Sequence, residues 1–359
     1  MSAEVERQRV PIRAWIALVV VYLVWGSTFT GIQVAIRAIP PLLMAGTRYL
    51  LAGLLLYAIA GRGRRWRLPA WRELRSAGIV GLLLLLGGNG LLSWAELRVP
   101  SGLAALIIAT VPLWMAVLGV AFWRQPSPGR VGWLGVLVGL AGVAVLANPG
   151  GGGHLNRLSI AALLLAALLW ALGSLYSRRA PMPTDVFLAS AVEMVIGGVG
   201  LVLAAVLTGE QGAVRWGQIL GPPALAYGWL VLGGAILGYT CYVYALKVLP
   251  TATVATYAYV NPAVALGLGF LILGQGLSPT TAVAAALITL GVVLMVSGPR
   301  LTRRQDRLSV AVVDGPGGLH LEEHRAHGSD PLEADALVDP DRPQIEVVHE
   351  QGHCLSLPQ

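Results

Sequence analysis

Charged residues are scarce in this chain. Asp, Glu, Lys and Arg make up only 12% of its 359 residues, about half of what a soluble domain of this size carries. Hydrophobic residues make up 56% and fall in blocks of about 20, the length of helix that crosses roughly 30 Å of hydrocarbon. This composition excludes a soluble protein and predicts an all-α polytopic membrane protein.

The chain also lacks the residue patterns of most catalytic and cofactor sites. Its two cysteines, Cys241 and Cys354, lie in an apolar block and in the polar C-terminal segment, so we expect no disulfide between them. It has no phosphate-binding glycine loop and no Ser/His/Asp arrangement, which leaves an enzyme or an ATP-driven pump without support. An H-x-x-E-H pattern at 320–324 has no surrounding domain to supply a third ligand. We therefore expect no enzyme, no cofactor and no metal site.

The apolar blocks predict ten membrane-spanning helices. They are placed at 14–36, 41–60, 75–97, 101–123, 130–148, 158–177, 184–207, 224–246, 251–273 and 279–297. The first block ends without a small-residue cleavage pattern, so we interpret it as a retained helix and not as a signal peptide. The helices are followed by a polar, acidic segment, 299–359, which we expect to be a disordered cytoplasmic tail.

The basic residues distinguish the two sides of the membrane. With the N-terminus in the cytoplasm, the inside segments carry 18 Lys and Arg and the outside loops carry 4. Because positive residues are enriched on the cytoplasmic side, this predicts an N-in/C-in protein of a bacterial plasma (inner) membrane. The basic residues thus report topology, and we expect no nucleic-acid partner.

The sequence repeats itself in two halves. At an offset of 150 residues Pro100 corresponds to Pro250 and Pro112 to Pro262, and at an offset of 145 Trp25 corresponds to Trp170. Further pairs at these offsets are Ala95/Ala245, Gly88/Gly238, Gly53/Gly198 and Arg48/Glu193. We expect a five-helix repeat at 14–148 and a second at 158–298, inverted because five is odd. Inverted repeats place a substrate site near the bilayer midplane and support alternating access.

Polar residues inside the expected helices are candidates for a solute path, because polar groups facing lipid are costly. Two helices carry polar residues along one face: Asn89, Ser93 and Glu96 on the third, and Thr253, Tyr257 and Asn261 on the ninth. The corresponding face of the fourth helix is apolar, so the two halves differ in chemistry. The alternative is that these groups only hydrogen-bond one helix to another.

Two charged residues, Arg48 and Glu193, occupy corresponding places in the second and seventh helices. Each is costly in hydrocarbon unless it is paired or faces water. Glu193, deep in its helix, and Glu96, near the outer end of its own, are candidates for proton coupling. A structural charge pair is the alternative, and Glu96 could instead pair with Arg98 or be solvated.

Prolines and aromatic residues add further candidates. Pro112 and Pro262 each remove a backbone hydrogen bond near the middle of a helix, which predicts kinks that act as gates or only as packing features. Several aromatic side chains lie within the spans, where they could hold planar or cationic solutes or simply pack the core. These are Trp25, Trp94, Trp114, Trp170, Tyr239 and Tyr242.

As a set, these segments resemble the EamA family of the drug/metabolite transporter superfamily, and within it the YedA-type bacterial permeases. The resemblance covers residues 14–298. It is carried by Trp25-Gly26-Ser27-Thr28, Pro40-Pro41-Leu42 followed by Arg48, Gly88-Asn89-Gly90, Ala95-Glu96, Val99-Pro100-Ser101-Gly102, Ala109-Thr110-Val111-Pro112 and Tyr257-Ala258-Tyr259-Val260-Asn261-Pro262.

The resemblance implies a ten-helix inverted-repeat carrier whose first, third, fourth, sixth, eighth and ninth helices surround a central cavity. Arg48 and Glu193 would then lie outside this inner ring. The substrate path that we expect comprises Trp25, Asn89, Ser93, Trp114, Trp170, Tyr239, Tyr257 and Asn261.

The expected function is a secondary transporter that exports small organic metabolites, amino acids or drugs. The expected partners are a small-molecule substrate, the lipid bilayer and, in coupled transport, protons, and the pattern is compatible with a monomer. Two alternatives stay open: a membrane sensor that signals through its acidic tail, and a lipid-handling carrier. Deleting 301–359 would abolish the output of a sensor but not the flux of a transporter.

Overall fold

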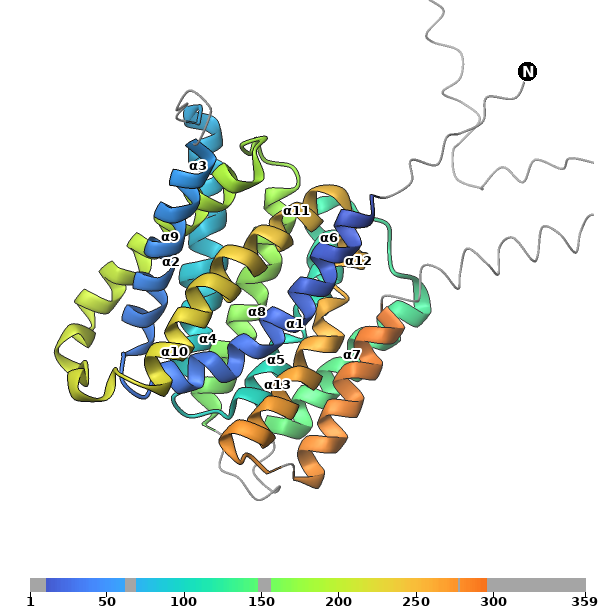
Figure 1. The fold of residues 1–359 in the computed structure, drawn as a ribbon. Helices are drawn as coiled ribbons and strands as arrows, with labels where there is room; N and C mark the ends of the chain where they lie inside the picture. Colours follow the sequence, from blue (N-terminus) through green and yellow to red (C-terminus); the bar gives the residue numbers. More distant parts are fainter. Residues whose placement is uncertain (1–10, 62–68, 148–155, 277, 296–359) are drawn as a thin grey trace, which may run out of the picture. The chain divides into compact units, whose positions relative to one another are not determined.

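The computed structural model describes residues 11–61, 69–147, 156–276 and 278–295 (Figure 1). All regular secondary structure in these ranges is helical. The first half contains α1 Ile12–Ala35, α2 Pro41–Gly61, α3 Trp71–Gly81, η1 Leu82–Gly90, α4 Leu91–Ala95, α5 Ser101–Ile108, α6 Val111–Trp123 and α7 Gly129–Ala147. The expected tail, the H-x-x-E-H pattern and Cys354 lie outside the described residues.

The second half repeats this order with an added loop. It contains α8 Arg157–Ser177, α9 Val186–Leu207, the 3-10 helices η2 Glu210–Ala213 and η3 Trp216–Gln218, α10 Pro222–Trp229, η4 Leu230–Tyr239, α11 Thr240–Val248, α12 Thr251–Val254, α13 Tyr257–Leu273 and a last helix, Pro279–Met295. Helical segments thus lie within a few residues of every expected span.

Seven of these helical stretches are long and apolar enough to cross a membrane. Three shorter apolar helices, Gly129–Val145, Val260–Leu273 and Pro279–Met295, lie at the expected fifth, ninth and tenth spans. The prediction of an all-helical polytopic membrane protein is confirmed. The count of ten crossings, the inverted repeats, their boundaries and the N-in/C-in topology stay predictions.

The third and eighth expected spans each contain a π-helical segment that the sequence analysis missed. In the third span it is η1, and in the eighth it is η4. An offset of 150 residues shifts η1 onto 232–240, which overlaps the observed η4. Because π-helical turns occur frequently at functional sites, the two segments direct attention to the residues that they carry.

The two central prolines sit differently in their helices. Pro112 follows a break at Ala109 and Thr110, between α5 and α6, as a proline that ends one helical segment and begins the next would. Pro262 lies inside α13, whereas the break in that span falls earlier, at Ala255 and Thr256. A kink at Pro112 therefore agrees with the helix boundary, but the break of the ninth span is not at its proline.

Glycines allow corresponding helices of the two halves to pack closely. The α2 and α9 helices run side by side (Figure 1), and a Cβ atom added to Gly198 would lie 2.9 Å from the backbone nitrogen of Leu50. The α7 helix packs against the last helix in the same way, because a Cβ on Gly135 would lie 2.4 Å from the Gly291 carbonyl oxygen. Each of these contacts joins one half to the other.

Replacing Gly198 with alanine should destabilise the protein by about 1–3 kcal/mol, because the added methyl group meets backbone atoms of α2 that cannot move independently. The control is Gly267→Ala in α13, where an added Cβ has no atom within 4 Å. There the change should be neutral or slightly stabilising. Thermal midpoints of the two variants in detergent measure the difference, and equal midpoints would contradict the close-packing role of Gly198.

The loop between α9 and α10 is fastened to the start of α2. The Glu210 carboxylate accepts a hydrogen bond from the backbone nitrogen of Leu43 at 2.9 Å, and Arg215 donates its backbone N–H to the Ala38 carbonyl at 2.9 Å. Burial raises the pKa of the Glu210 carboxyl, and the backbone hydrogen bonds oppose that shift. The carboxylate satisfies an N-terminal donor of α2 that has no partner within the helix.

Candidate functional site

A cavity of about 60 Å³ lies where residues of both halves meet. Its lining comes from α1, α2, η1, α4, α5, α8, η4 and α13. The lining residues are Trp25, Thr28, Phe29, Arg48, Tyr49, Gly88, Asn89, Leu92, Ile108, Ala166, Trp170, Gly234, Tyr257 and Asn261. A cavity of this size holds on the order of a few water molecules, so a whole organic solute needs the surrounding helices to move apart.

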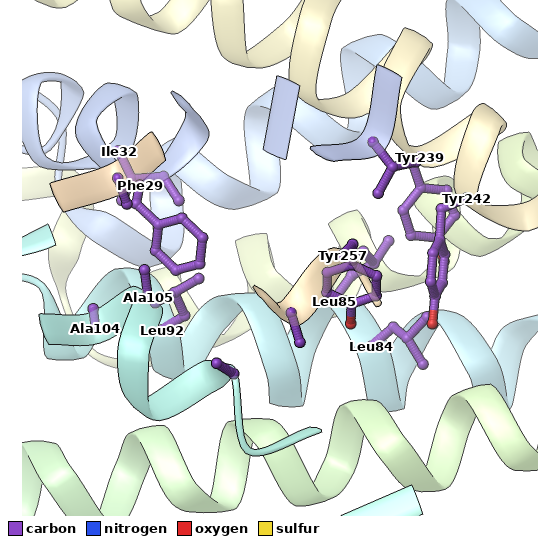
Figure 2. Close-up of a cluster of buried hydrophobic side chains, with 14 of the residues drawn as sticks. Phe29, Ile32, Leu84, Leu85, Leu92, Ala104, Ala105, Tyr239, Tyr242 and Tyr257 are labelled. Carbon is purple, nitrogen blue, oxygen red and sulfur yellow. The ribbon is translucent and has the colours of Figure 1, made fainter. Parts of the chain in front are cut away.

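Aromatic side chains form one wall of the cavity, with Trp25 at their centre. The Trp25 ring lies 5.3 Å from Trp170 and 5.5 Å from Tyr257 between centroids, both edge to face, and 4.8 Å from Tyr242. The Trp25 indole nitrogen donates to the Gly234 carbonyl of η4 at 3.1 Å. Figure 2 shows Tyr239, Tyr242 and Tyr257 beside the buried Leu84 and Leu85. Trp25, Trp170 and Tyr257, which line the cavity, thus form an aromatic and largely apolar wall.

Both tryptophans pack on a glycine of the π-helical segment of the other half. A Cβ on Gly88 would lie 2.8 Å from Trp170, and a Cβ on Gly238 would lie 2.6 Å from the Trp25 indole nitrogen. The two glycines correspond at the offset of 150, and the two tryptophans at 145. The tryptophan of each half thus packs on the corresponding glycine of the other half.

The lining of the cavity also has a polar part, which includes Arg48 and Asn89. Arg48 of α2 donates from its Nη2 atom to the Tyr49 hydroxyl at 2.9 Å and to the Asn89 side-chain oxygen at 2.5 Å. Ser93 donates to the same oxygen at 3.4 Å. We expected Arg48 to lie outside the inner ring, but this is wrong, because Arg48 is among the residues that line the cavity and its side chain bonds to Asn89 of η1.

Glu193 lines a second, larger cavity of about 220 Å³ with Arg178 and Lys247. The Tyr239 hydroxyl donates to the Glu193 carboxylate at 2.7 Å, and the Tyr239 ring lies 6.4 Å from Trp25. Glu193 is therefore one side chain away from the aromatic wall, outside the central cavity as expected.

Five of the eight expected path residues line the central cavity: Trp25, Asn89, Trp170, Tyr257 and Asn261. The other three, Ser93, Trp114 and Tyr239, do not line it. Glu96, Glu193, Pro112 and Pro262 do not line it either. The functional roles of all these residues stay predictions. Tyr49 also lines the cavity but was not among the predicted residues, because no repeat pair and no polar stripe marks it.

A polar cluster, which we call the Gln33 cluster, joins the end of α1, the start of α5 and the segment after α13. The Gln33 side-chain oxygen accepts from the Ser101 backbone at 3.0 Å and from the Gln275 amide at 2.5 Å. The Ser101 hydroxyl donates to Gln275 at 3.1 Å. The Gln33 amide nitrogen donates to the backbone carbonyls of Glu96 and Val99, at 3.5 and 3.4 Å. Residues of both halves are thus tied together at one end of the helices.

The second half repeats part of this cluster. Arg178, the counterpart of Gln33, donates to the carbonyls of Leu246 and Leu249 at 2.7 and 3.2 Å, which are the counterparts of the Glu96 and Val99 carbonyls. Gln125 is the counterpart of Gln275. Within the described residues, its side chain makes no hydrogen bond to Arg178 or Thr251, so the bonds that close the Gln33 cluster across the halves are absent here.

Known proteins match nearly the whole helical part of the chain. The EamA-like transporter family matches residues 12–148 and again 157–297. The uncharacterized inner membrane transporter YedA of Escherichia coli strain K12 is 38% identical over 287 residues, covering 79% of this chain and 91% of that protein. The uncharacterized transporter YvbV of Bacillus subtilis strain 168 is 30% identical over 226 residues, covering 60% of this chain and 73% of its own.

The fold is shared with a solved crystal structure, which is 21% identical, has a TM-score of 0.59 and covers 82% of this chain and 98% of its own. The predicted resemblance is confirmed, as is the predicted plasma-membrane location, since YedA is an inner membrane transporter and the described helices are apolar enough to cross a bilayer several times. The chain belongs to the EamA-like transporter family and is a membrane transporter.

Proposed function

We propose that the protein is a secondary transporter that exports small organic metabolites, amino acids or drugs by alternating access, without covalent change to the solute. In this proposal ten helices cross the membrane with both termini in the cytoplasm. Residues 14–148 and 158–298 form the two inverted repeats, and the pivots are Pro112 and, in the ninth helix, the break at Ala255 and Thr256 ahead of Pro262. The solute binds in the central cavity between the aromatic wall and Arg48.

The observation that carries the proposal is the unequal pair of contacts made by Gln33 and Arg178. Corresponding residues of the two halves hold corresponding carbonyl groups, which supports the repeat. The proposed topology places Gln33 at the outer face and Arg178 at the inner face. The outer contacts are extended across the halves by Gln275. At the inner face Gln125 makes no corresponding bond within the described residues, and the halves are joined there by Arg179, which donates to the Trp123 carbonyl.

This asymmetry is what a carrier in one of two states would have. In this proposal the Gln33 cluster closes the outer face, and the cavity beside Arg178 lies toward the inner face. Rocking of one half against the other would break the Gln33 cluster and bring Gln125 to Arg178 and Thr251. Such an exchange of related contacts is the expected mechanism of an inverted-repeat carrier.

Transport is tested with the full chain in proteoliposomes loaded with a metabolite mixture. We expect specific solutes to leave the vesicles faster than from protein-free vesicles, with the external composition read by mass spectrometry. If no solute leaves the protein-containing vesicles faster than it leaves protein-free vesicles, the proposed function is overturned. Solutes identified in this way supply the substrate for the variants below.

If transport is coupled to protons, the flux driven by a pH gradient should be at least about tenfold lower in the double variant Glu96→Gln, Glu193→Gln than in the wild type. The reason is that an amide cannot carry a proton. Glu96 is 2% exposed and Glu193 1%, so both are shielded from water. Glu73→Gln is the control, since Glu73 accepts a hydrogen bond from the Ala70 backbone at the start of α3, away from both cavities. An unchanged gradient dependence in the double variant would remove both carboxylates from coupling.

A further inference from the structure

We propose that Arg48 anchors a carboxylate group, so that the solutes of the central cavity are monoanionic organic acids with a flat or apolar body. The inference rests on the proposed function, because it assigns a solute class to the same cavity. Three observations support it: the unpartnered nitrogens of the Arg48 guanidinium, the charges around this group, and the aromatic residues that line the same cavity.

Arg48 is buried but only partly bonded. Its side chain is 2% exposed and lines the central cavity. The Nη2 atom is used by Tyr49 and Asn89, whereas the Nε and Nη1 atoms have no hydrogen-bond partner. A guanidinium carries five N–H donors, so three of them are buried without an acceptor. Leaving charged donors unsatisfied is expensive, and an anion that reaches these nitrogens when the halves open would remove this cost.

Glu96 is the buried carboxylate that interacts electrostatically with Arg48, yet it does not fill this vacancy. Neither Glu96 oxygen accepts a hydrogen bond from any described residue. The guanidinium is instead held from the side, with its central carbon 4.5 Å from the Tyr49 ring centroid and its Nη2 atom on Asn89. The guanidinium is therefore fixed in place by neutral partners, and its Nε and Nη1 atoms are enclosed by the protein without an acceptor in this state.

The charge and shape of the cavity select the class of ligand. Arg48 is the one charged residue among those that line it, so the lining matches a single negative charge and disfavours a cation. Guanidinium groups bind planar carboxylates well because the two geometries match. The cavity is also faced by Trp25, Trp170 and Tyr257, which provide an aromatic, largely apolar wall for the rest of the molecule. A cavity of about 60 Å³ accepts the carboxylate end, and opening of the halves admits the body.

The test uses three probes of nearly equal shape: phenylacetate, phenylacetamide and phenethylamine, with hexanoate as an aliphatic acid. Thermal midpoints of the purified full-length protein are recorded against probe concentration, because a ligand that binds the native state stabilises it. We expect the two acids to raise the midpoint and the amide and the amine to leave it unchanged. In Arg48→Gln, the apparent Kd for phenylacetate should rise about 10- to 100-fold.

Two further variants keep the test decisive. Arg98→Gln removes an exposed arginine whose guanidinium lies over the Trp94 ring, outside the cavity, and should leave the acid affinity unchanged. Arg48→Lys keeps the charge but not the planar donors, and should weaken acid binding several-fold. If Arg48→Gln fails to fold, Arg48→Lys decides.

The inference is overturned if no acid shifts the wild-type midpoint, if the amide or the amine binds as well as the acid, or if the Arg48 variants keep wild-type affinity. These outcomes differ from failure of the proposed function. Flux of neutral or cationic solutes that persists in Arg48→Gln would refute the carboxylate anchor and leave transport intact. Acids that bind through Arg48 but are never translocated would refute transport and leave the anchor intact.

Discussion

Cross-linking position 33 to position 275 should reduce transport to the background of protein-free vesicles, and cleaving the cross-link should restore it. The Gln33 and Gln275 side chains meet at 2.5 Å although they are 242 residues apart, and they belong to different halves. A hydrogen bond contributes only about 0.5–1.5 kcal/mol, so the bonds of the Gln33 cluster can break in each transport cycle. A covalent bridge cannot, and it would hold the protein in the state with this end closed.

The experiment replaces both glutamines with cysteine in a chain in which Cys241 and Cys354 are serine. A short thiol-reactive linker with an internal disulfide bridges the pair, and a reducing agent reopens it. The control is a Ser278, Thr281 cysteine pair, since these hydroxyls lie 2.9 Å apart within one helix start and join no two halves. If mass spectrometry shows that the 33–275 bridge is complete and the flux is still that of the uncrosslinked protein, the end that holds the Gln33 cluster has no gating role.

The positions of the helices could be predicted because a membrane helix has a strong sequence signal. Twenty apolar residues between polar connections are visible without any alignment, and the observed helices start and end within a few residues of the expected bounds. The members of the cavity could be predicted in part for a related reason. Asn89 and Asn261 are polar groups in apolar surroundings, and Trp25 and Trp170 are marked by the repeat.

Other features depend on geometry that composition does not encode. The π-helical segments η1 and η4 change only the hydrogen-bond register of the backbone. The sequence of an apolar helix does not distinguish α-helical from π-helical hydrogen bonds. The break at Ala255 and Thr256 has no proline, so no local signal placed it there. Arg48 was expected outside the ring because the resemblance implies that its helix is, whereas α2 contributes both Arg48 and Tyr49 to the cavity lining.

Replacing Trp25 with alanine should lower the stability of the protein by about 3–5 kcal/mol and remove transport in the fraction that still folds. Trp25 contacts the rings of Trp170, Tyr239, Tyr242 and Tyr257 at centroid distances of 4.8–6.4 Å. Each such ring pair adds about 0.5–1.5 kcal/mol beyond the area that it buries. The indole also holds the Gly234 carbonyl of η4, so its loss leaves that group without this partner.

The matched control is Trp216→Ala, which removes the same side chain from η3, where it is 76% exposed. Its thermal midpoint and flux should equal those of the wild type. Trp25→Phe separates packing from hydrogen bonding, since it keeps a ring against Gly238 but loses the N–H donor to Gly234. We expect this variant to fall between the wild type and Trp25→Ala in both measurements. A Trp25→Ala protein as stable and as active as the Trp216→Ala protein would show that the aromatic wall neither supports the fold nor shapes the solute path.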